Sequence, residues 1–409
     1  MDENKKNSFE KIIYNALIVL LVSSTILFFI LGFKLNEEFF IKYSVDKILK
    51  ASTIQRIHSL QQGMILFSIL IFIATMIIIR SKFRVISFLR KHKTIVQNIL
   101  LLLCVIIIII VTSETILGWQ LSEKTFGSGF GPNSIRFNAE HVHLNTDKMR
   151  DREFSVLKPK NTIRIAGLGD SFTFGSGVKN VNDTFLKLIE KKLNSQEERN
   201  VQYEVLNFGI AGRDTEDELN ILKEKALKYN PDIIIISYVL NDFKNVDPAV
   251  KVSKKYVEII PFASLWLRNI LYSYAIAEMK LNKIIEKLGL KTAPENVTLI
   301  EFESDINKRY NAALFDEIGK ITRERDKKVV VVIFPVLYQL KDYMFSEIHE
   351  FVRNASEKNG FFVIDLYNTY KEYDESEIIV NKYDTHPNEL GHRIAADAIF
   401  ESLIKNKIV

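Results

Sequence analysis

Three long apolar runs dominate the pattern of hydrophobic and polar positions in the first 120 residues of the chain. They cover residues 12–33, 63–79 and 94–113, and none of them contains a charged residue. A helix needs about 20 predominantly apolar residues to cross the hydrocarbon core of a bilayer. The pattern therefore predicts three membrane-spanning helices. The alternative, helices buried in a soluble core, is rarely so free of charge.

The first apolar run also differs from a cleaved signal peptide. It is longer than the usual apolar core of such a peptide, and no small-x-small cleavage site follows it. We therefore expect an anchor that stays on the protein.

The loop between the second and third runs predicts the orientation of the anchor. It carries six basic residues and no acidic one: Arg80, Lys82, Arg84, Arg90, Lys91 and Lys93. Short loops rich in lysine and arginine stay in the cytoplasm, so the chain beyond Trp119 is predicted to lie outside the cytoplasmic membrane. The formal net charge of +5 then mainly reflects topology, and we expect no nucleic-acid partner.

Beyond a glycine-rich stretch at 126–134, strand-like and helix-like segments alternate along the chain. Continuous Val/Ile-rich runs, which are typical of strands buried on both faces, occur at 163–168, 203–210, 232–239, 328–335 and 361–366. Helical patterns occur at 184–196, 215–229, 304–326, 343–359 and 388–405. This alternation predicts a three-layer α/β/α domain with a mostly parallel five-stranded sheet.

The expected domain organisation is a membrane anchor at 1–119, a lead-in at 120–160 and the α/β domain at 161–409. The interval 244–302 is long for one crossover and is predicted to be an insertion. Its apolar, aromatic part is interpreted either as an extra helix packed on the domain or as a lid or a surface resting on the bilayer.

The first predicted strand ends in Gly169-Asp170-Ser171, within IRIAGLGDSFTFGSGV. This turn is not a dinucleotide fingerprint, because Phe172 stands where the third glycine is required. It is not a P-loop either, because Val178 follows the last glycines instead of Gly-Lys-Ser/Thr. A serine exposed at a strand end remains as a candidate nucleophile.

The ends of the other predicted strands carry the partners that such a serine needs. NFGIAG places Gly212 after the second strand, SYVLND places Asn241 after the third, and YDTHPN places Asp384 and His386 before the last helix. An imidazole activates a serine hydroxyl, a carboxylate orients the imidazole, and N–H donors hold the oxyanion. Because Asp384 and His386 are two residues apart, an extended chain puts both on the same side.

This ordered set resembles the SGNH/GDSL hydrolase family, in particular its membrane-anchored members. The resemblance implies that Ser171 is the nucleophile, His386 and Asp384 the catalytic pair, and Gly212 and Asn241 the oxyanion hole. The stretch NTDKMRDREF at 145–154 resembles the lead-in of membrane-anchored members. Two departures from the family pattern are Val239, where a glycine is frequent, and the single residue between Asp384 and His386.

The expected function is a membrane-anchored serine esterase that cleaves O-acyl esters, acetyl or lipid, on cell-envelope glycans or lipids. The alternatives are an O-acyltransferase supplied by a membrane acyl-donor partner, and a non-catalytic glycan-binding module. No cofactor or metal is expected, because no cluster has metal-ligand spacing and the expected mechanism needs no metal. The only cysteine, Cys104, lies within the third apolar run, which leaves no disulfide framework and no thiolate metal site.

Other histidines have weaker interpretations. His141 and His143 form a His-x-His pair that is a possible metal pair or simply exposed. His392 is expected to support the last helix, and His349, in a charged helical segment, is expected to be solvated.

Overall fold

The computed structural model describes residues 3–38, 51–121, 131–196, 201–251, 257–260, 264–292 and 294–409. The chain forms two compact units. One contains Met1–Ser122 and Glu258–Ala275, and the other contains Glu123–Val257 and Ile276–Val409.

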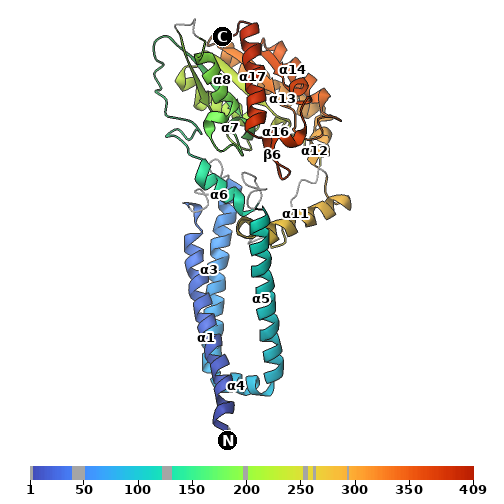
Figure 1. The fold of residues 1–409 in the computed structure, drawn as a ribbon. Coiled ribbons are helices and arrows are strands. Elements are labelled where there is room, and N and C mark those ends of the chain that lie inside the picture. Colours follow the sequence, from blue (N-terminus) through green and yellow to red (C-terminus); the bar gives the residue numbers. More distant parts are fainter. Residues whose placement is uncertain are drawn as a thin grey trace. The chain divides into compact units, whose positions relative to one another are not determined.

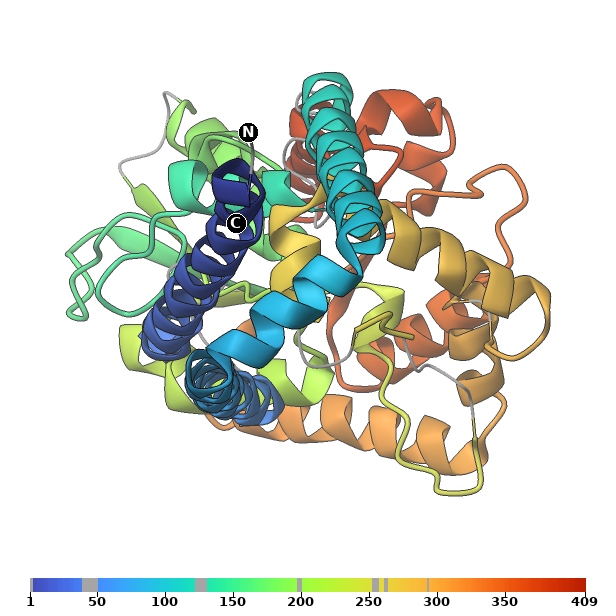
Figure 2. The same cartoon turned by 90° about the horizontal axis from the view of Figure 1, so that it is seen from below.

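The first unit is built on the three apolar helices that the sequence predicts: α1 (Glu3–Lys34), α3 (Ala51–Arg80) and α5 (Lys93–Leu121). A short helix, α4 (Lys82–Lys91), joins α3 to α5 (Figure 2). The stretches Glu10–Lys34, Gln61–Arg80 and Lys93–Leu121 are each long and apolar enough to cross a membrane. The third helix continues beyond residue 113, where its apolar run ends.

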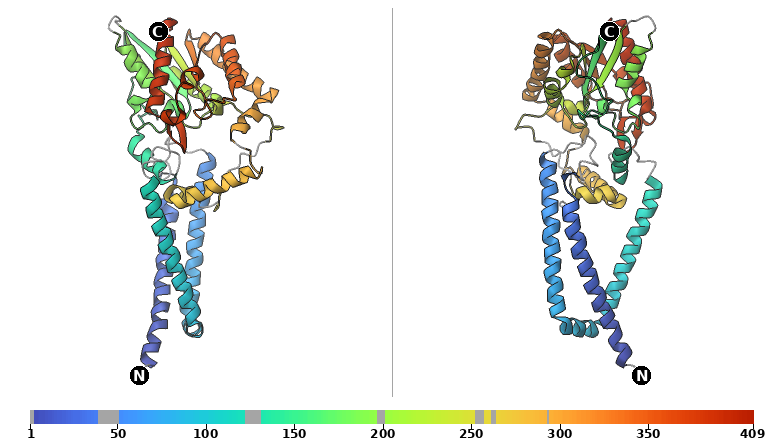
Figure 3. Two further views of the ribbon diagram at one scale, coloured as in Figure 1. Left: turned by 45° about the vertical axis from the view of Figure 1, so that its right-hand side comes forward. Right: turned by 90° about the vertical axis from the view of Figure 1, so that its left-hand side faces the viewer.

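Helices α1 and α3 lie side by side (Figure 3). The rings of Phe28 and Phe67 meet edge to face at a centroid distance of 5.0 Å. A Cβ on Gly32 would lie 2.7 Å from the side chain of Ile65, so the missing side chain permits this close approach.

Part of the predicted insertion belongs to this first unit. It comprises α10 (Ser264–Ile270) and the first turn of α11 (Tyr272–Lys287). The carboxylate of Glu114, on α5, accepts hydrogen bonds from the backbone N–H groups of Tyr272 and Ser273, both at 2.9 Å. The N–H groups of a helical first turn have no acceptor within their own helix, so the Glu114 carboxylate caps α11.

The second unit is centred on a five-stranded sheet in which every pairing is parallel. The strand order is β2-β1-β3-β4-β5. The strands are β1 (Thr162–Gly169), β2 (Gln202–Asn207), β3 (Ile233–Tyr238), β4 (Lys328–Ile333) and β5 (Phe362–Asp365). All five predicted strands are confirmed, and so is the α/β class.

Helices cover both faces of this sheet (Figures 1 and 3). One face packs against α8 (Phe185–Asn194) and α17 (Glu389–Lys405). The other packs against α9 (Thr215–Glu224), α13 (Asp305–Arg323) and α14 (Ser346–Lys358). The strand order reverses between β1 and β3, and in such sheets the crevice at the carboxyl ends of these strands is the usual binding site.

A second, two-stranded antiparallel sheet was not expected from the sequence. It pairs β6 (Ile379–Asn381) with β7 (Asp384–Pro387). The remaining elements of this unit are α6 (Pro132–His141), α7 (Ser171–Phe174), α12 (Pro294–Phe302), α15 (Tyr367–Tyr370), α16 (Glu375–Ile378) and the 3-10 turns η1 (Val181–Asp183), η2 (Ala226–Tyr229) and η3 (Leu240–Asp242).

Candidate active site

Ser171 stands at the turn between β1 and α7, as the first residue of that short helix. Asp170 precedes it and caps the helix, because its carboxylate accepts a hydrogen bond from the N–H of Phe172 at 2.9 Å. The turn is tight at Gly169, where a Cβ would come within 2.1 Å of the Thr173 hydroxyl. A glycine in this position therefore allows the tight turn that places Ser171 at the carboxyl end of β1.

His386 joins Ser171 to Asp384. Its Nε2 lies 2.8 Å from the Ser171 hydroxyl oxygen, and its Nδ1 contacts the carboxylate of Asp384. Strand β7 is extended across this segment, so both side chains point to the same side as the sequence predicted. Asp384 is buried, while His386 and Ser171 are half-buried and reach solvent. The three side chains together can move a proton from the serine to the imidazole.

The charges around His386 favour its protonated form. Burial alone would lower the pKa of the imidazole, but the hydrogen bond and charge of Asp384, with the charge of Asp170, raise that pKa above its ordinary value of 6.5. A raised pKa makes the imidazole a stronger base towards the serine proton.

Asn241 lies on η3, just beyond β3, and faces the same crevice as Ser171. Its side-chain amide donates a hydrogen bond to Asp170 at 2.9 Å. The Ser171 hydroxyl is 3.1 Å from the same carboxylate oxygen, so Asp170 contacts both residues. The sequence indicated only a turn-shaping role for Asp170. Its bridging role depends on a contact across 71 positions, which no local pattern reveals.

Gly212 lies in the turn after β2, with a positive φ of 71° and an exposed position. It is not among the described residues that line the crevice, so its oxyanion role stays a prediction. Two other residues of the NFGIAG segment hold the nucleophile turn instead. Asn207 donates to the carbonyl oxygen of Thr173 at 2.9 Å, and a Cβ on Gly209 would lie 2.4 Å from the backbone nitrogen of Phe174.

The lead-in motif at 145–154 is also built into the site. The buried guanidinium of Arg150 donates to the carbonyl oxygens of Gly175 and Val178, each at 2.5 Å, directly after α7. Burial lowers the pKa of Arg150 to about 10, so the side chain remains charged at neutral pH. Arg150 thus ties the lead-in to the loop that follows Ser171.

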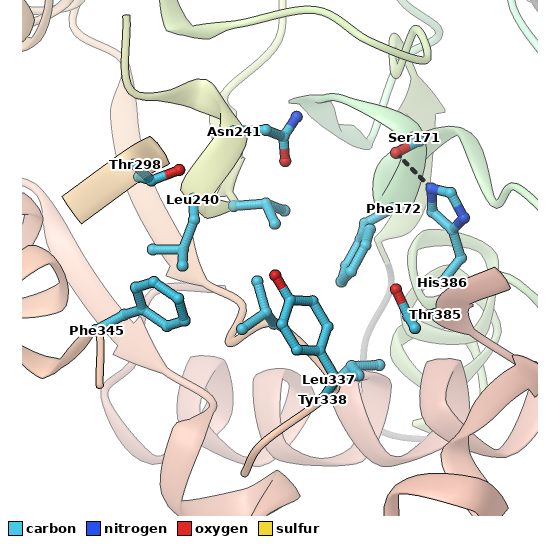
Figure 4. A pocket seen from close by; sticks show the side chains of 12 residues that line it. Ser171, Phe172, Leu240, Asn241, Thr298, Leu337, Tyr338, Phe345, Thr385 and His386 are labelled. Carbon is cyan, nitrogen blue, oxygen red and sulfur yellow. Dashed lines mark hydrogen bonds between the residues drawn. The ribbon is translucent and has the colours of Figure 1, made fainter. Parts of the chain in front are cut away.

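A pocket of about 330 Å³ opens beside Ser171 (Figure 4). Its lining is largely apolar, and among the lining residues that the structure describes the ionisable side chains are His386 and one tyrosine. The lining residues are Ser171, Phe172, Val239, Leu240, Asn241, Thr298, Val336, Leu337, Tyr338, Phe345, Thr385 and His386. Val239, which stands where the family often has glycine, is thereby a wall of this pocket.

The other histidines lie elsewhere. His392 is buried on α17, as expected, where its Nδ1 accepts from the N–H of Phe185 at 3.2 Å. Burial lowers the pKa of His392 to about 3, so it is neutral. The prediction for His349 is wrong, because its ring is buried between Tyr343 and Asp365. Within the described ranges, no group of three or more metal-ligating residues includes His141 and His143.

A comparison with profiles of known protein families identifies the class to which the chain belongs. The sequence profile of the GDSL-like lipase/acylhydrolase family matches residues 168–394, which is more than half of the chain. The protein belongs to this family of ester hydrolases. None of the curated proteins matches the chain.

Solved structures of esterases resemble it at low identity. A two-domain esterase (CEX) active on acetylated mannans is 15% identical, with a TM-score of 0.38 over 61% of this chain. The chain spans about half of that esterase, 50% of its length. The acetyl xylan esterase AlAXEase is 16% identical, with a TM-score of 0.36 over 59% of this chain and 100% of its own. Axe2, an acetylxylan esterase from Geobacillus stearothermophilus, is 14% identical, with a TM-score of 0.37 over 59% of this chain and 94% of its own.

Proposed function

We propose that the protein is a membrane-anchored serine ester hydrolase that works through an acyl-enzyme on Ser171. The observation that carries the proposal is the hydrogen-bonded chain from Ser171 through His386 to Asp384 at the mouth of a pocket. A non-catalytic glycan-binding module has no use for a serine aligned on an imidazole in this way.

In the proposed reaction, the oxygen of Ser171 attacks the ester carbonyl while its proton passes to Nε2 of His386. Asp384 holds the N–H at Nδ1 and stabilises the imidazolium. The tetrahedral intermediate then collapses: the bond to the alcohol breaks and His386 returns the proton to the departing oxygen. Water, activated by the same imidazole, releases the acid from Ser171.

The side-chain amide of Asn241 is proposed as an oxyanion donor. Asp170 occupies one of its two N–H groups, which fixes the amide plane and leaves the second N–H for the substrate oxygen. The backbone N–H of Gly212 is proposed as a further donor, on the resemblance of NFGIAG to the family motif alone.

Water is the proposed acyl acceptor. Asn241 and Thr385, at the mouth of the pocket, are exposed, so solvent reaches the ester bond at Ser171. The test is partitioning: an activated ester is supplied with and without envelope glycan, and free acid is measured against acylated glycan. Predominant free acid supports hydrolysis, and predominant acylated glycan at modest acceptor concentration identifies an O-acyltransferase.

The nucleophile is tested by labelling the full-length protein with a fluorophosphonate probe. We expect labelling that is lost in Ser171→Ala and retained in Ser195→Ala, a control at an exposed serine directly after α8. Absence of labelling in well-folded wild-type protein would contradict the proposal and favour a binding module.

The proposed location of the catalytic unit is outside the cytoplasmic membrane. The support is the acid-free basic segment around α4, which joins the second and third apolar helices. A reporter fused after Val409 is expected to be active only outside the cytoplasm, and one inserted near Lys91 only inside. Cytoplasmic activity of the fusion at Val409 would overturn this orientation.

A further inference from the structure

The pocket beside Ser171 is much larger than an acetyl group. Its volume of about 330 Å³ corresponds to about ten groups of the size of a water molecule. An acetyl group has three non-hydrogen atoms and would leave most of this space unfilled. The pocket therefore has room for a considerably longer acyl group.

The position of His386 decides which part of an ester enters the pocket. The departing alcohol oxygen must take its proton from Nε2 of His386, so the alcohol lies on the side of that ring. The acyl group must then extend away from it. Figure 4 shows Leu240, Phe345 and Thr298 on the side of the pocket opposite Ser171 and His386.

The lining at this far side is apolar. Leu240 and Phe345 are almost fully buried, with 3% and 1% of their surfaces exposed, and Leu337 in the same lining is also buried. Among the described lining residues, Thr298 is polar at this far side, and Tyr338 and Asn241 lie between it and Ser171. Such a surface offers few hydrogen bonds to a sugar and no opposite charge to an ionised acyl group, but it gains free energy by covering methylene groups.

We infer that this pocket binds an aliphatic acyl chain of about six to eight carbons, which rests on the proposed esterase function and specifies its substrate class. The chain runs from Ser171 past Leu240 to Thr298, and the alcohol remains outside the pocket. The esters of choice are therefore medium-chain acyl esters rather than acetyl esters.

The first experiment measures kcat/KM of full-length protein in detergent for p-nitrophenyl acetate, butyrate, hexanoate and octanoate. Each buried methylene is expected to raise kcat/KM about fourfold until the pocket is full, so hexanoate should exceed acetate roughly a hundredfold or more. A flat profile, or one that falls from acetate onwards, would overturn the inference while leaving the esterase function intact.

A variant pair locates the effect in the pocket. Thr298→Trp adds bulk at the far end of the pocket, whereas Asn296→Trp adds the same bulk at an exposed position of α12, on another side of the helix. We expect Thr298→Trp to lower kcat/KM for octanoate at least tenfold while acetate changes little, and Asn296→Trp to retain the wild-type profile. Both variants are assayed in the same detergent, so partitioning of the esters into the detergent lowers the two kcat/KM values equally. Equal profiles for the two variants would contradict the inference.

Binding is measured separately from catalysis with the Ser171→Ala variant and octanoate, by calorimetry. Octanoate should bind at least tenfold more tightly than acetate, and the added Thr298→Trp change should remove the difference. If octanoate binds in this way but wild-type protein hydrolyses no ester, the proposed function fails and the acyl site stands. If esters are hydrolysed but octanoate binds no better than acetate, the acyl site fails and the proposed function stands.

Discussion

The α/β unit contains two hydrogen-bonded chains of the same composition: a hydroxyl, a histidine and an aspartate. In one, the Ser171 oxygen lies 2.8 Å from Nε2 of His386, whose Nδ1 contacts Asp384. In the other, the Tyr343 oxygen lies 2.6 Å from Nε2 of His349. The Nδ1 of His349 lies 3.1 Å from the carboxylate of Asp365.

Their surroundings differ. His386 is half-buried at the mouth of a pocket, whereas His349 is 4% exposed and its ring meets that of Tyr343 edge to face. Burial raises the pKa of the Tyr343 hydroxyl, although a hydrogen bond with the backbone of Val336 acts in the opposite direction. Although burial disfavours its charge, Asp365 has a lowered pKa through its hydrogen bond with His349 and the nearby charge of Arg353.

A hydrogen-bonded chain of hydroxyl, histidine and aspartate therefore does not by itself define a catalytic centre. A hydroxyl must also meet substrate beside a donor for the oxyanion, and Ser171 has a pocket and Asn241 beside it. The second chain instead holds Tyr343 against the backbone of Val336, which forms part of the pocket wall. We assign it a structural role, and the following variants separate the two roles.

The largest effect is expected for His386→Ala. Without the base, kcat/KM for ester hydrolysis should fall by about ten-thousandfold or more, because the serine hydroxyl is then a weak nucleophile. The melting temperature should change little, since the ring is only half-buried. Steady-state kinetics and thermal unfolding measure the two effects. A loss of less than tenfold would contradict the assignment of the base.

Asp384→Asn should have the next largest effect, lowering kcat by about a thousandfold to ten-thousandfold because the imidazole loses its tautomer control and charge partner. The pH profile gives a second readout. Neutral His386 is the active form and Asp384 raises its pKa above 6.5, so wild-type activity should fall as the pH drops through that raised value. In Asp384→Asn the residual activity should persist to lower pH. Unchanged kcat and an unchanged acid limb would mean that another acid orients the ring.

Asn241→Ala should lower kcat by about a hundredfold to a thousandfold with little change in KM, because the amide donor acts on the oxyanion of the transition state. Asn296→Ala is the matched control, since Asn296 is exposed on α12 and is not among the described lining residues of the pocket. It should leave kcat within about threefold. An effect of Asn241→Ala on KM alone would make Asn241 a substrate-binding residue.

The smallest effect on catalysis is expected for His349→Gln. This variant leaves buried partners imperfectly paired, which costs about 1–3 kcal/mol of stability. The melting temperature should fall by about 3–10 °C. Per folded molecule, kcat/KM should remain within about threefold of wild type. A loss as large as that of His386→Ala, with unchanged stability, would show that the second chain is catalytic.

The sequence predicts much of this arrangement because the relevant signals are local. Charge-free runs identify α1, α3 and α5, and continuous Val/Ile runs identify strands such as β3 and β4, which are buried on both faces. Catalytic side chains usually gather at the carboxyl ends of parallel strands, so Ser171 and Asn241 could be selected as candidates before the structure placed both at one pocket.

What the sequence did not reveal depends on contacts between distant segments. The hydrogen bond from Asn241 to Asp170 joins residues 71 positions apart. His349 is buried because β5 and residues 343–345 pack around α14, a helix whose sequence is rich in charged residues. The β6–β7 pair has strands of only three and four residues, too short for an alternating pattern to predict them.

The most direct test of the central claim is to trap the acyl-enzyme. Full-length wild-type protein is mixed with p-nitrophenyl hexanoate, quenched in acid within milliseconds to seconds, digested and analysed by mass spectrometry. We expect a hexanoyl mass increment on the peptide that carries Ser171, absent in Ser171→Ala and present in Ser195→Ala. Turnover of the ester with the increment on another residue, such as Tyr343, would contradict the central claim.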